Sequence, residues 1–474
     1  MTTSVGAPTP KRYSSLRQTL VIATLACCSL CAAFTQTLLI PIQSSLPDLL
    51  GAPASQTAWV ITVTLLAFSI VVPIAGRLGD MYGKRRIAIW LMALLITGSV
   101  LAAVSGNLAG VLVGRALQGV SMGVIPIGMS LMRDVIDKER LGTSIALVSA
   151  TLGVGGAIGL PMSAVITEYY NWHALFVVTA VLASFGLALL VLIVPRTGVR
   201  TYGRLDVPGV IGLAIGLIGI LLPISRGNDW GWTSLPTLAG FIIGGVSLIV
   251  WGWHELRTKT PLVDLRVSAR PAILFTNLAS VAMGFALFAA NVAFPQLLQL
   301  PEAVGGLGFD LIPASLSLMP AGLAMLAAAP LAGRLERTIG PRLLLVTGAS
   351  IMAVAYVYCI IWQPGYWGIA VVNTIIGVGI GLGYAAMPAQ IMAAVPVSET
   401  AAANGLNAFM RSFGTTTAAA VVGAILSAAT PATIIDSFGT VYVLGLIAAL
   451  TCAVLAFMVP HGRTPEGVAA PVAA

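Results

Sequence analysis

The amino-acid sequence predicts an all-α, polytopic membrane protein with fourteen transmembrane helices. Of its 474 residues, 58% are hydrophobic and only 8% are charged, whereas a soluble domain carries about 25% charged residues. The apolar residues fall in runs of about twenty, the length at which a helix spans a bilayer. A glycine-rich basic loop also occurs twice between such runs. A loop that recurs in two halves of a membrane protein indicates internal duplication.

The apolar runs set the order of the helices. Residues 1–17 form a polar tail with Lys11, Arg12 and Arg17. Since no convincing cleavage site follows this tail, the first run is predicted to remain in the protein as a span. The predicted helices lie near residues 18–41, 54–76, 87–105, 108–131, 143–166, 173–194, 206–224, 235–253, 272–297, 312–333, 341–362, 367–393, 401–427 and 438–459.

The basic residues support this count. With fourteen spans, twenty-one of the twenty-four lysines and arginines fall on the side of the N-terminus and only Arg226 falls on the other, while Arg115 and Arg411 lie within spans. Cytoplasmic loops are enriched in basic residues, so both termini are expected in the cytoplasm of a multi-pass plasma-membrane protein. The net charge of +8 is spread over these short loops. Without a basic face interleaved with aromatics, no nucleic-acid partner is expected.

The remaining composition predicts neither a metal nor a cofactor. The five cysteines all fall inside apolar runs, and the three histidines are scattered over loops and span ends. Cysteines in such positions are more typical of small, buried hydrophobic residues than of disulfides or metal ligands. No nucleophile–base pair or phosphate loop stands out, so the chain is not expected to be an enzyme.

The duplication has two markers. The loop from Gly76 to Arg86 (GRLGDMYGKRR) has a shorter, similar copy at 333–342 (GRLERTIGPR). The second marker is Pro41 followed by Leu46-Pro47, which has a counterpart at the same spacing in Pro295 followed by Leu300-Pro301. Helices one to six therefore match helices nine to fourteen. The predicted units are an N-terminal tail at 1–17, a six-helix bundle at 18–194, two inserted helices with their flanking loops at 195–271, a second six-helix bundle at 272–459 and a C-terminal tail at 460–474.

At this point the chain resembles the major facilitator superfamily, in particular its fourteen-span drug:proton antiporters. The loop from Gly76 to Arg86 matches the signature between spans two and three, and Arg115-Ala-Leu-Gln118-Gly119 matches the signature of span four. Span five carries an antiporter-like motif, with Leu160 interrupting its Gly-Pro pair. That motif comprises Gly155, Gly156, Gly159 and Pro161. The resemblance implies the major facilitator fold, two pseudo-twofold-related bundles pivoting about a central cleft.

The resemblance also implies a gate, in which Asp80 engages a partner across the bundle; Arg133 is the candidate partner. Arg115 would act in coupling or substrate contact, since a cation inside a span costs about 2.5–3.5 kcal/mol on insertion scales. Two structural alternatives stay open: Asp80 and its basic neighbours fix only the topology, and Arg115 is satisfied by main-chain carbonyls. The gating and coupling candidates are Gly76, Arg77, Asp80, Gly83, Lys84, Arg85, Arg115, Gln118, Gly119 and Arg133.

The candidates for the substrate pathway are polar residues within spans. Asn404, Asn407 and Arg411 share one helical face, although polar packing around a snorkelling Arg411 is an equally good interpretation. The full set is Thr35, Gln36, Gln43, Asn277, Asn291, Gln296, Asn404, Asn407 and Arg411.

One feature departs from the family. Many fourteen-span antiporters carry an acid in span one, whereas residues 33–37 here have none, and the predicted mid-membrane region has no Asp or Glu. Proton coupling therefore follows from the resemblance alone, with Asp80, Asp134 and Glu168 as candidates near the span ends. Two buried arginines without an acid favour neutral, zwitterionic or anionic amphiphiles as cargo.

The sequence thus predicts a secondary transporter that exports small amphiphilic compounds or drugs by alternating access, driven by the proton gradient. Its expected partners are a small-molecule substrate, protons and the lipid bilayer, with no obligatory protein partner. An importer or facilitator of a small solute is the alternative within transport. A non-transporting membrane sensor or scaffold is the alternative from another class.

Overall fold

The computed structural model describes residues 13–39, 42, 46–57, 59–196, 205–258, 261–263, 265–395, 400–427 and 429–460. Within these ranges the chain is helical and contains no strand. The sequence explains this, because a segment in lipid must satisfy every main-chain N–H and C=O internally, as a helix does. The predicted all-α membrane fold is confirmed.

The helices follow the predicted runs closely. The first part contains α1 (Ser15–Thr37), α2 (Leu46–Leu50), α3 (Ala54–Thr57), α4 (Trp59–Tyr82), α5 (Lys84–Val104), α6 (Leu108–Ser121), α7 (Val124–Val135), α8 (Lys138–Tyr169) and α9 (Ala174–Ile193). The inserted part contains α10 (Val207–Trp230), α11 (Leu235–Arg257) and α12 (Leu265–Ser268). The last part contains α13 (Pro271–Gln299), η1 (Glu302–Val304), α14 (Leu311–Leu316), α15 (Met319–Ile361), α16 (Tyr366–Ala394), α17 (Thr400–Ser427) and α18 (Ile434–Met458).

Two crossings share the long helix α15. Thirteen segments of the described chain are long and apolar enough to cross a membrane, and one of them runs for 50 residues over Ile312–Ile361. Gly340 interrupts this segment with a φ of +78°, a conformation that glycine adopts without the cost a Cβ would add. The chain reverses there, just as it does at Gly83, where φ is +100° between α4 and α5. Counting α15 as two crossings gives the fourteen predicted helices.

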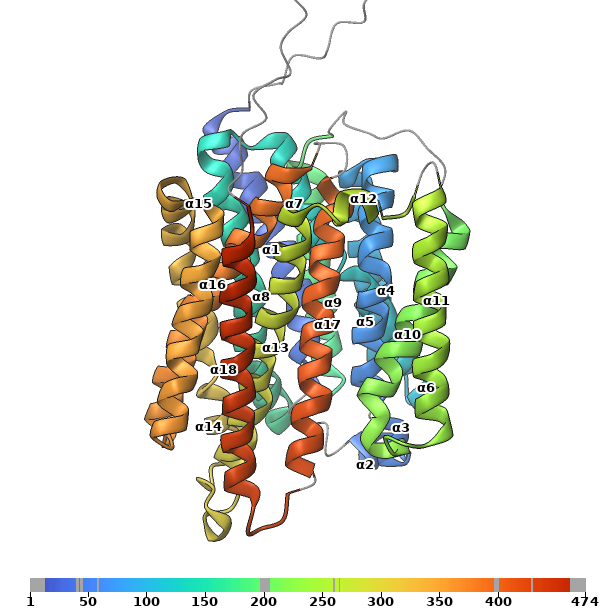
Figure 1. The fold of residues 1–474 in the computed structure, drawn as a ribbon. Helices are drawn as coiled ribbons and strands as arrows, with labels where there is room; N and C mark the ends of the chain where they lie inside the picture. Colours follow the sequence, from blue (N-terminus) through green and yellow to red (C-terminus); the bar gives the residue numbers. More distant parts are fainter. Residues whose placement is uncertain are drawn as a thin grey trace, which may run out of the picture.

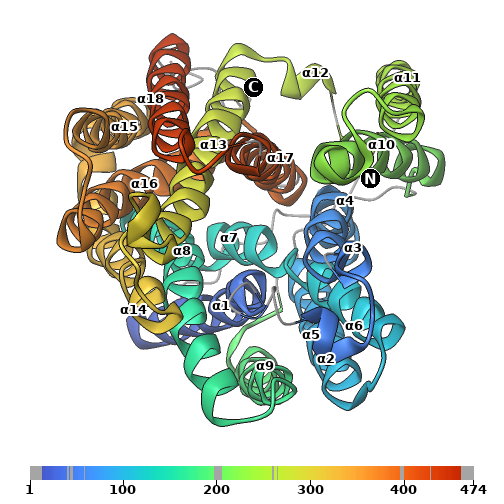
Figure 2. The same cartoon turned by 90° about the horizontal axis from the view of Figure 1, so that it is seen from below.

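The long helices stand side by side in one bundle (Figure 1). We call residues 13–196 the first half and residues 271–460 the second half. Within the first half α1 packs on α8 and α9, and α5 packs on α6; within the second, α15 packs on α16 and α18, and α13 packs on α17. The two halves meet where α8 contacts α15 and where α4 contacts α17. Seen end-on, α7 and α17 lie near the centre of the bundle (Figure 2).

The inserted pair α10–α11 lies at the periphery (Figure 2). Helix α10 packs against both α4 and α17 through an apolar cluster that includes Leu66, Leu213, Leu217 and Phe409. Helix α11 packs mainly on α10 and buries only Thr237, Gly244 and Glu255. The inserted pair therefore covers one junction of the two halves, with α11 on the outside.

Helix α1 begins and α18 ends at the same end of the bundle, which is the upper end in Figure 1. We call it the basic end, because the chain reversals that carry Lys84 and Arg337 lie there. The opposite end carries α2, α3 and α14.

Candidate functional site

The two halves are joined across the basic end by Asp80. This residue is 1% exposed, in the last turns of α4, and its Oδ2 accepts a hydrogen bond of 3.0 Å from the main-chain N–H of Ala402. Ala402 lies in the first turn of α17, where main-chain N–H groups lack helical partners and the helix dipole favours an anion. The acid in the duplicated loop thus binds the start of a helix from the other half.

Arg133 also binds the second half at the start of α17, through side-chain hydrogen bonds of its own. Its guanidinium donates to the Thr400 hydroxyl at 2.6 Å and to the Val395 carbonyl at 3.2 and 3.3 Å. Both acceptors belong to the second half and flank the start of α17. Arg133 as a donor and Asp80 as an acceptor, both from the first half, therefore hold the start of α17.

The basic residues of the loop from Gly76 to Arg86 bind different partners. Lys84 and Asp134 form an ion pair of 2.9 Å whose side chains are 0% and 1% exposed. Arg85 instead donates to the Val191 carbonyl of α9 at 2.7 Å. These contacts tie the start of α5 to α7 and α9 within the first half. Gly76 and Gly83 are buried and Arg77 is 8% exposed at the same reversal.

The second copy of the loop also touches the opposite half. A Cβ placed on Gly142 would come within 2.6 Å of the Glu336 carboxylate, and one on Gly333 would meet the Thr143 main chain at 2.4 Å. Arg337 donates to the Glu139 carbonyl at 3.3 Å. The loop at 333–342 is thereby packed against the first turns of α8. Both copies of the loop close the basic end.

Arg115 lies at the centre of a network inside the first half. It is 1% exposed and donates to the Val60 carbonyl at 3.1 Å, to the Thr35 carbonyl at 2.9 Å and to Gln118 Oε1 at 2.8 Å. Gln118 Nε2 in turn donates to the Ser99 hydroxyl at 2.8 Å, which extends the network to α5. The guanidinium thus joins α1, α4 and α6. This geometry corresponds to the alternative in which main-chain carbonyls satisfy the buried cation.

Glycines set close helix contacts around this network. A Cβ on Gly119 would lie 2.3 Å from the Thr64 carbonyl oxygen of α4, and one on Gly155 would lie 2.6 Å from the Ala33 Cβ of α1. Gly159 likewise faces Phe34 and Thr37, whereas Gly153 faces Met325 of the second half. The glycine-rich face of α8, in the same helix as Gly156 and Pro161, therefore serves close packing on α1 and across the halves.

The second half holds a polar cluster between α13, α16 and α17. Asn407 donates to Asn277 Oδ1 at 3.0 Å and to the Ser280 hydroxyl at 2.7 Å. Asn404, one turn nearer the basic end and 3% exposed, has no hydrogen-bond partner for either side-chain atom among the described residues. Gln390, on α16, is 7% exposed and leaves Oε1 equally unpartnered. A buried amide without a partner costs about 1–3 kcal/mol, so such groups require an explanation.

Arg411 lies one turn beyond this cluster on α17. It is 7% exposed, and its guanidinium carbon sits 4.6 Å from the centroid of the Tyr384 ring. No carboxylate lies within 4 Å of it in the described part of the chain. The next residue, Ser412, meets Ser69 of α4 at 3.0 Å. Sequence reasoning missed this link between the halves and the partners Ser280, Tyr384 and Gln390, because isolated small or aromatic residues in spans carry no distinguishing pattern.

The other predicted pathway residues are dispersed. The Thr35 hydroxyl is buried and bonded to the Ala32 carbonyl at 2.7 Å. Gln36 and Asn291 are half-buried and Gln296 is exposed. Gln43 lies outside the described residues. The structure therefore groups Asn277, Asn404, Asn407 and Arg411 and leaves the rest apart.

At the opposite end a cavity of about 870 Å³ opens between the halves. It is lined from the first half by Thr167, Glu168 and Trp172 and from the second by Asp310 and Pro313. Cross-half contacts close the basic end, whereas here side chains of the two halves face each other across a space.

Comparisons with known proteins agree with this architecture. The model of the Major Facilitator Superfamily matches residues 25–415 and 276–472. The lincomycin resistance protein LmrB of Listeria monocytogenes is 25% identical over 373 residues, 78% of each chain. The cephamycin export protein CmcT of Amycolatopsis lactamdurans is 27% identical over 489 aligned positions, 99% of this chain and 98% of its own. The crystal structure of the human organic anion transporter MFSD10 (TETRAN) gives a TM-score of 0.61 at 13% identity and covers 91% of this chain and 99% of that one. This last likeness shows the fold.

Proposed function

Because this chain belongs to the major facilitator superfamily, we propose that it exports small amphiphilic compounds across the plasma membrane by alternating access. The basic end would face the cytoplasm, as the distribution of basic residues predicts. The observation that carries the proposal is the asymmetry between the two ends. Asp80 and Arg133 bind the start of α17 at the basic end, while the cavity beside Glu168 and Asp310 lies at the other.

In this proposal the structure represents the state that releases substrate to the outside. Residues 18–194 and 272–459 would rock as two six-helix units, with 195–271 inserted between them and short tails at 1–17 and 460–474. The contacts of Asp80 and Arg133 break when the basic end opens, so they set the equilibrium between the two states. Close glycine packing along α8 limits leakage between the halves.

The substrate would be neutral, zwitterionic or anionic. Asn404 offers an unpartnered amide group and Gln390 an unpartnered side-chain oxygen, and Arg411 offers a cation without an acidic neighbour in the described chain. A hydrogen-bonding substrate would supply the missing partners, which an aliphatic one would not. The names of two relatives refer to lincomycin resistance and to cephamycin export, and the second of these names supports export as the direction of transport.

Coupling to protons is the remaining part of the proposal. Asp80, Asp134 and Glu168 are its candidates. Asp134 is held by Lys84 at 2.9 Å and Asp80 by Ala402 at 3.0 Å. A proton on Asp80 would remove the charge that the start of α17 stabilises, which links protonation to opening of the basic end.

Reconstitution in liposomes tests the proposal. Purified protein is mixed with a panel of cationic, neutral, zwitterionic and anionic amphiphiles, with and without an imposed pH gradient. We expect gradient-driven movement of neutral, zwitterionic or anionic compounds against a concentration difference. Preferred export of quaternary ammonium dyes would contradict the substrate class. Movement only down the concentration gradient, unchanged by pH, would identify a facilitator instead.

A further inference from the structure

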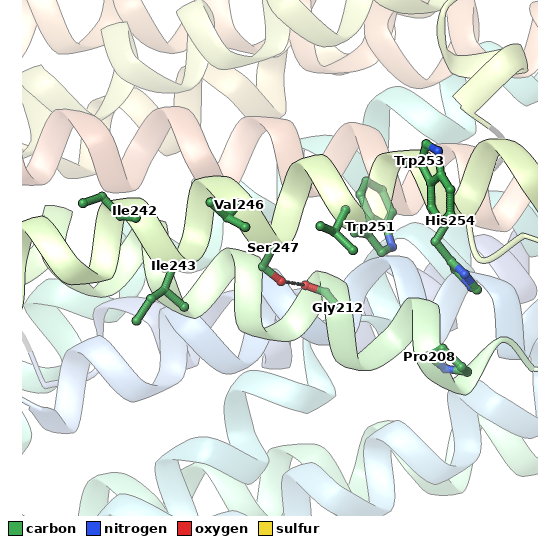
Figure 3. Close-up of a pocket in the computed structure, with 10 residues that line it drawn as sticks. Pro208, Gly212, Ile242, Ile243, Val246, Ser247, Trp251, Trp253 and His254 are labelled. Carbon is green, nitrogen blue, oxygen red and sulfur yellow. Dashed lines mark hydrogen bonds between the residues drawn. The ribbon is translucent and has the colours of Figure 1, made fainter.

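We propose that the groove between α10 and α11 is a binding site for one acyl chain of an anionic phospholipid from the leaflet at the basic end. This proposal needs only that the helices lie in a membrane and is independent of the direction of transport. The groove holds about 590 Å³, and Figure 3 shows its lining. From α11 it is lined by Ile243, Val246 and Trp253, which are 55–56% exposed, and from α10 by Pro208 and Gly212.

The sequence explains why the two helices part here. Near the opposite end they touch through their backbones, because a Cβ on Gly219 would lie 2.5 Å from the Gly244 Cα. Nearer the basic end the indole of Trp251 lies between them, 3.4 Å from a Cβ placed on Gly212. Glycine pairs allow close approach of helices, whereas a bulky side chain separates them. The result is a groove that widens toward the basic end and opens to the lipid side of α11.

Two polar side chains of the lining already have partners, whereas the buried Trp251 Nε1 has none among the described residues. The Ser247 hydroxyl donates to the Gly212 carbonyl at 2.9 Å, as drawn in Figure 3. His254 Nε2 lies 2.9 Å from Asp206 Oδ2. The groove therefore presents mostly hydrocarbon to its occupant, which suits an acyl chain better than a hydrogen-bonding solute.

A cation stands at the mouth of the groove. The Arg257 guanidinium carbon lies 4.1 Å from the centroid of the Trp253 ring. Arg266 lies next to it, donating to the Leu256 carbonyl at 2.9 Å. No carboxylate lies within 4 Å of Arg257 among the residues with defined positions. Tryptophan and arginine at a helix end mark the headgroup level of a bilayer, where a phosphate would complement the cation.

The dimensions agree with this occupant. The lining of α11 extends from Ile242 to His254, which at 1.5 Å per residue is about 18 Å. One leaflet contributes about 15 Å of hydrocarbon to the bilayer core. A chain that begins at Arg257 and follows the groove would therefore reach the bilayer midplane. Apolar lining, cation and length together distinguish the groove from the rest of the exposed face of α11.

Photochemical crosslinking tests the site on the full chain reconstituted in phosphatidylcholine vesicles. The probe is phosphatidylglycerol with a photoreactive group in its acyl chain, and labelled peptides are mapped by mass spectrometry. We expect labelling within 207–216 and 242–254, competed by unlabelled phosphatidylglycerol about fivefold better than by phosphatidylcholine. Fivefold corresponds to about 1 kcal/mol for one basic residue near a membrane surface.

Variants on one helix provide matched controls. Val246→Trp fills the groove and is expected to abolish the labelling, whereas Ile249→Trp, at a position 74% exposed outside the lining, leaves it intact. Arg257→Gln should remove the preference for phosphatidylglycerol and Arg257→Lys should keep it. Equal competition by both lipids, or equal loss in the two tryptophan variants, would overturn the proposal. If the lipid labelling were absent and protein–protein crosslinks formed through α11 instead, the groove would belong to an interface with a second copy of the chain. That result would also overturn the proposal.

Discussion

Replacing Asp80 with asparagine is expected to loosen the closed basic end. The carboxylate holds the Ala402 N–H at 3.0 Å in the first turn of α17. Asparagine keeps an acceptor and loses the charge, which is worth about 1 kcal/mol at a helix start. Alanine leaves the half-buried Ala402 N–H without that acceptor, at a cost of about 1–3 kcal/mol. Since 1.4 kcal/mol is tenfold in an equilibrium constant, the ratio of closed to open molecules should fall about fivefold for asparagine and about thirtyfold at 2 kcal/mol for alanine.

Spin-label distance measurements provide the assay. Labels replace Tyr82 and Ile339, which are 48% and 37% exposed at the basic end in different halves, after substitution of the native cysteines. We expect a growing long-distance population in the order wild type, Asp80→Asn, Asp80→Ala. Glu139→Gln is the matched control, because it removes a negative charge from an exposed side chain at the same end. Unchanged distances in both Asp80 variants, or an equal change in the control, would refute the gating role.

Three further substitutions test the buried polar groups. Lys84→Met removes the ion-pair partner that Lys84 provides to the buried Asp134 and should lower the free energy of unfolding by about 3–5 kcal/mol, seen as a lower melting temperature in detergent. Adding Asp134→Leu should restore most of the lost melting temperature. Arg115→Ala removes three hydrogen bonds to α1, α4 and Gln118 and should lower melting temperature and transport together, whereas transport lost at an unchanged melting temperature would favour a direct coupling role. Asn404→Leu removes an unpartnered buried amide, so the melting temperature should hold or rise while transport in liposomes falls; unimpaired transport would place the polar cluster outside the substrate path.

The fold could be predicted because lipid restricts the possible structures. Helix lengths, the reversals at Gly83 and Gly340 and the duplicated loop all follow from local sequence. Their agreement with the structure extends to the long helix α15, whose reversal at Gly340 falls between two predicted helices. These features depend on neighbours in the chain and on the thickness of a bilayer.

The site could be predicted only in part, because its partners lie far apart in the chain. The sequence marks Asp80 as a candidate gate residue, but the group that it binds is the main-chain N–H of Ala402, and a main-chain N–H leaves no signature in sequence. Arg115 was singled out as a buried cation, but its partners Val60 and Thr35 contribute carbonyl oxygens that every residue possesses. A sequence therefore reveals a charged side chain inside a span, but it does not reveal which main-chain group that side chain binds.

The duplicated loops extend this point to the mechanism. Each copy places an acid against the early turns of a helix from the opposite half: Asp80 at Ala402 in α17 and Glu336 at Gly142 in α8. Of these two acids, Asp80 accepts a hydrogen bond from the opposite helix, whereas Glu336 Oε2 has no hydrogen-bond partner within the described ranges. The two closures of the basic end are therefore related by the duplication but differ in their contacts. Asp80 binds α17 through a carboxylate hydrogen bond, whereas the loop at 333–342 binds α8 through close glycine packing and the hydrogen bond from Arg337 to the Glu139 carbonyl. A charge-assisted hydrogen bond holds each closure, so we expect weakening of either one to favour opening of the basic end.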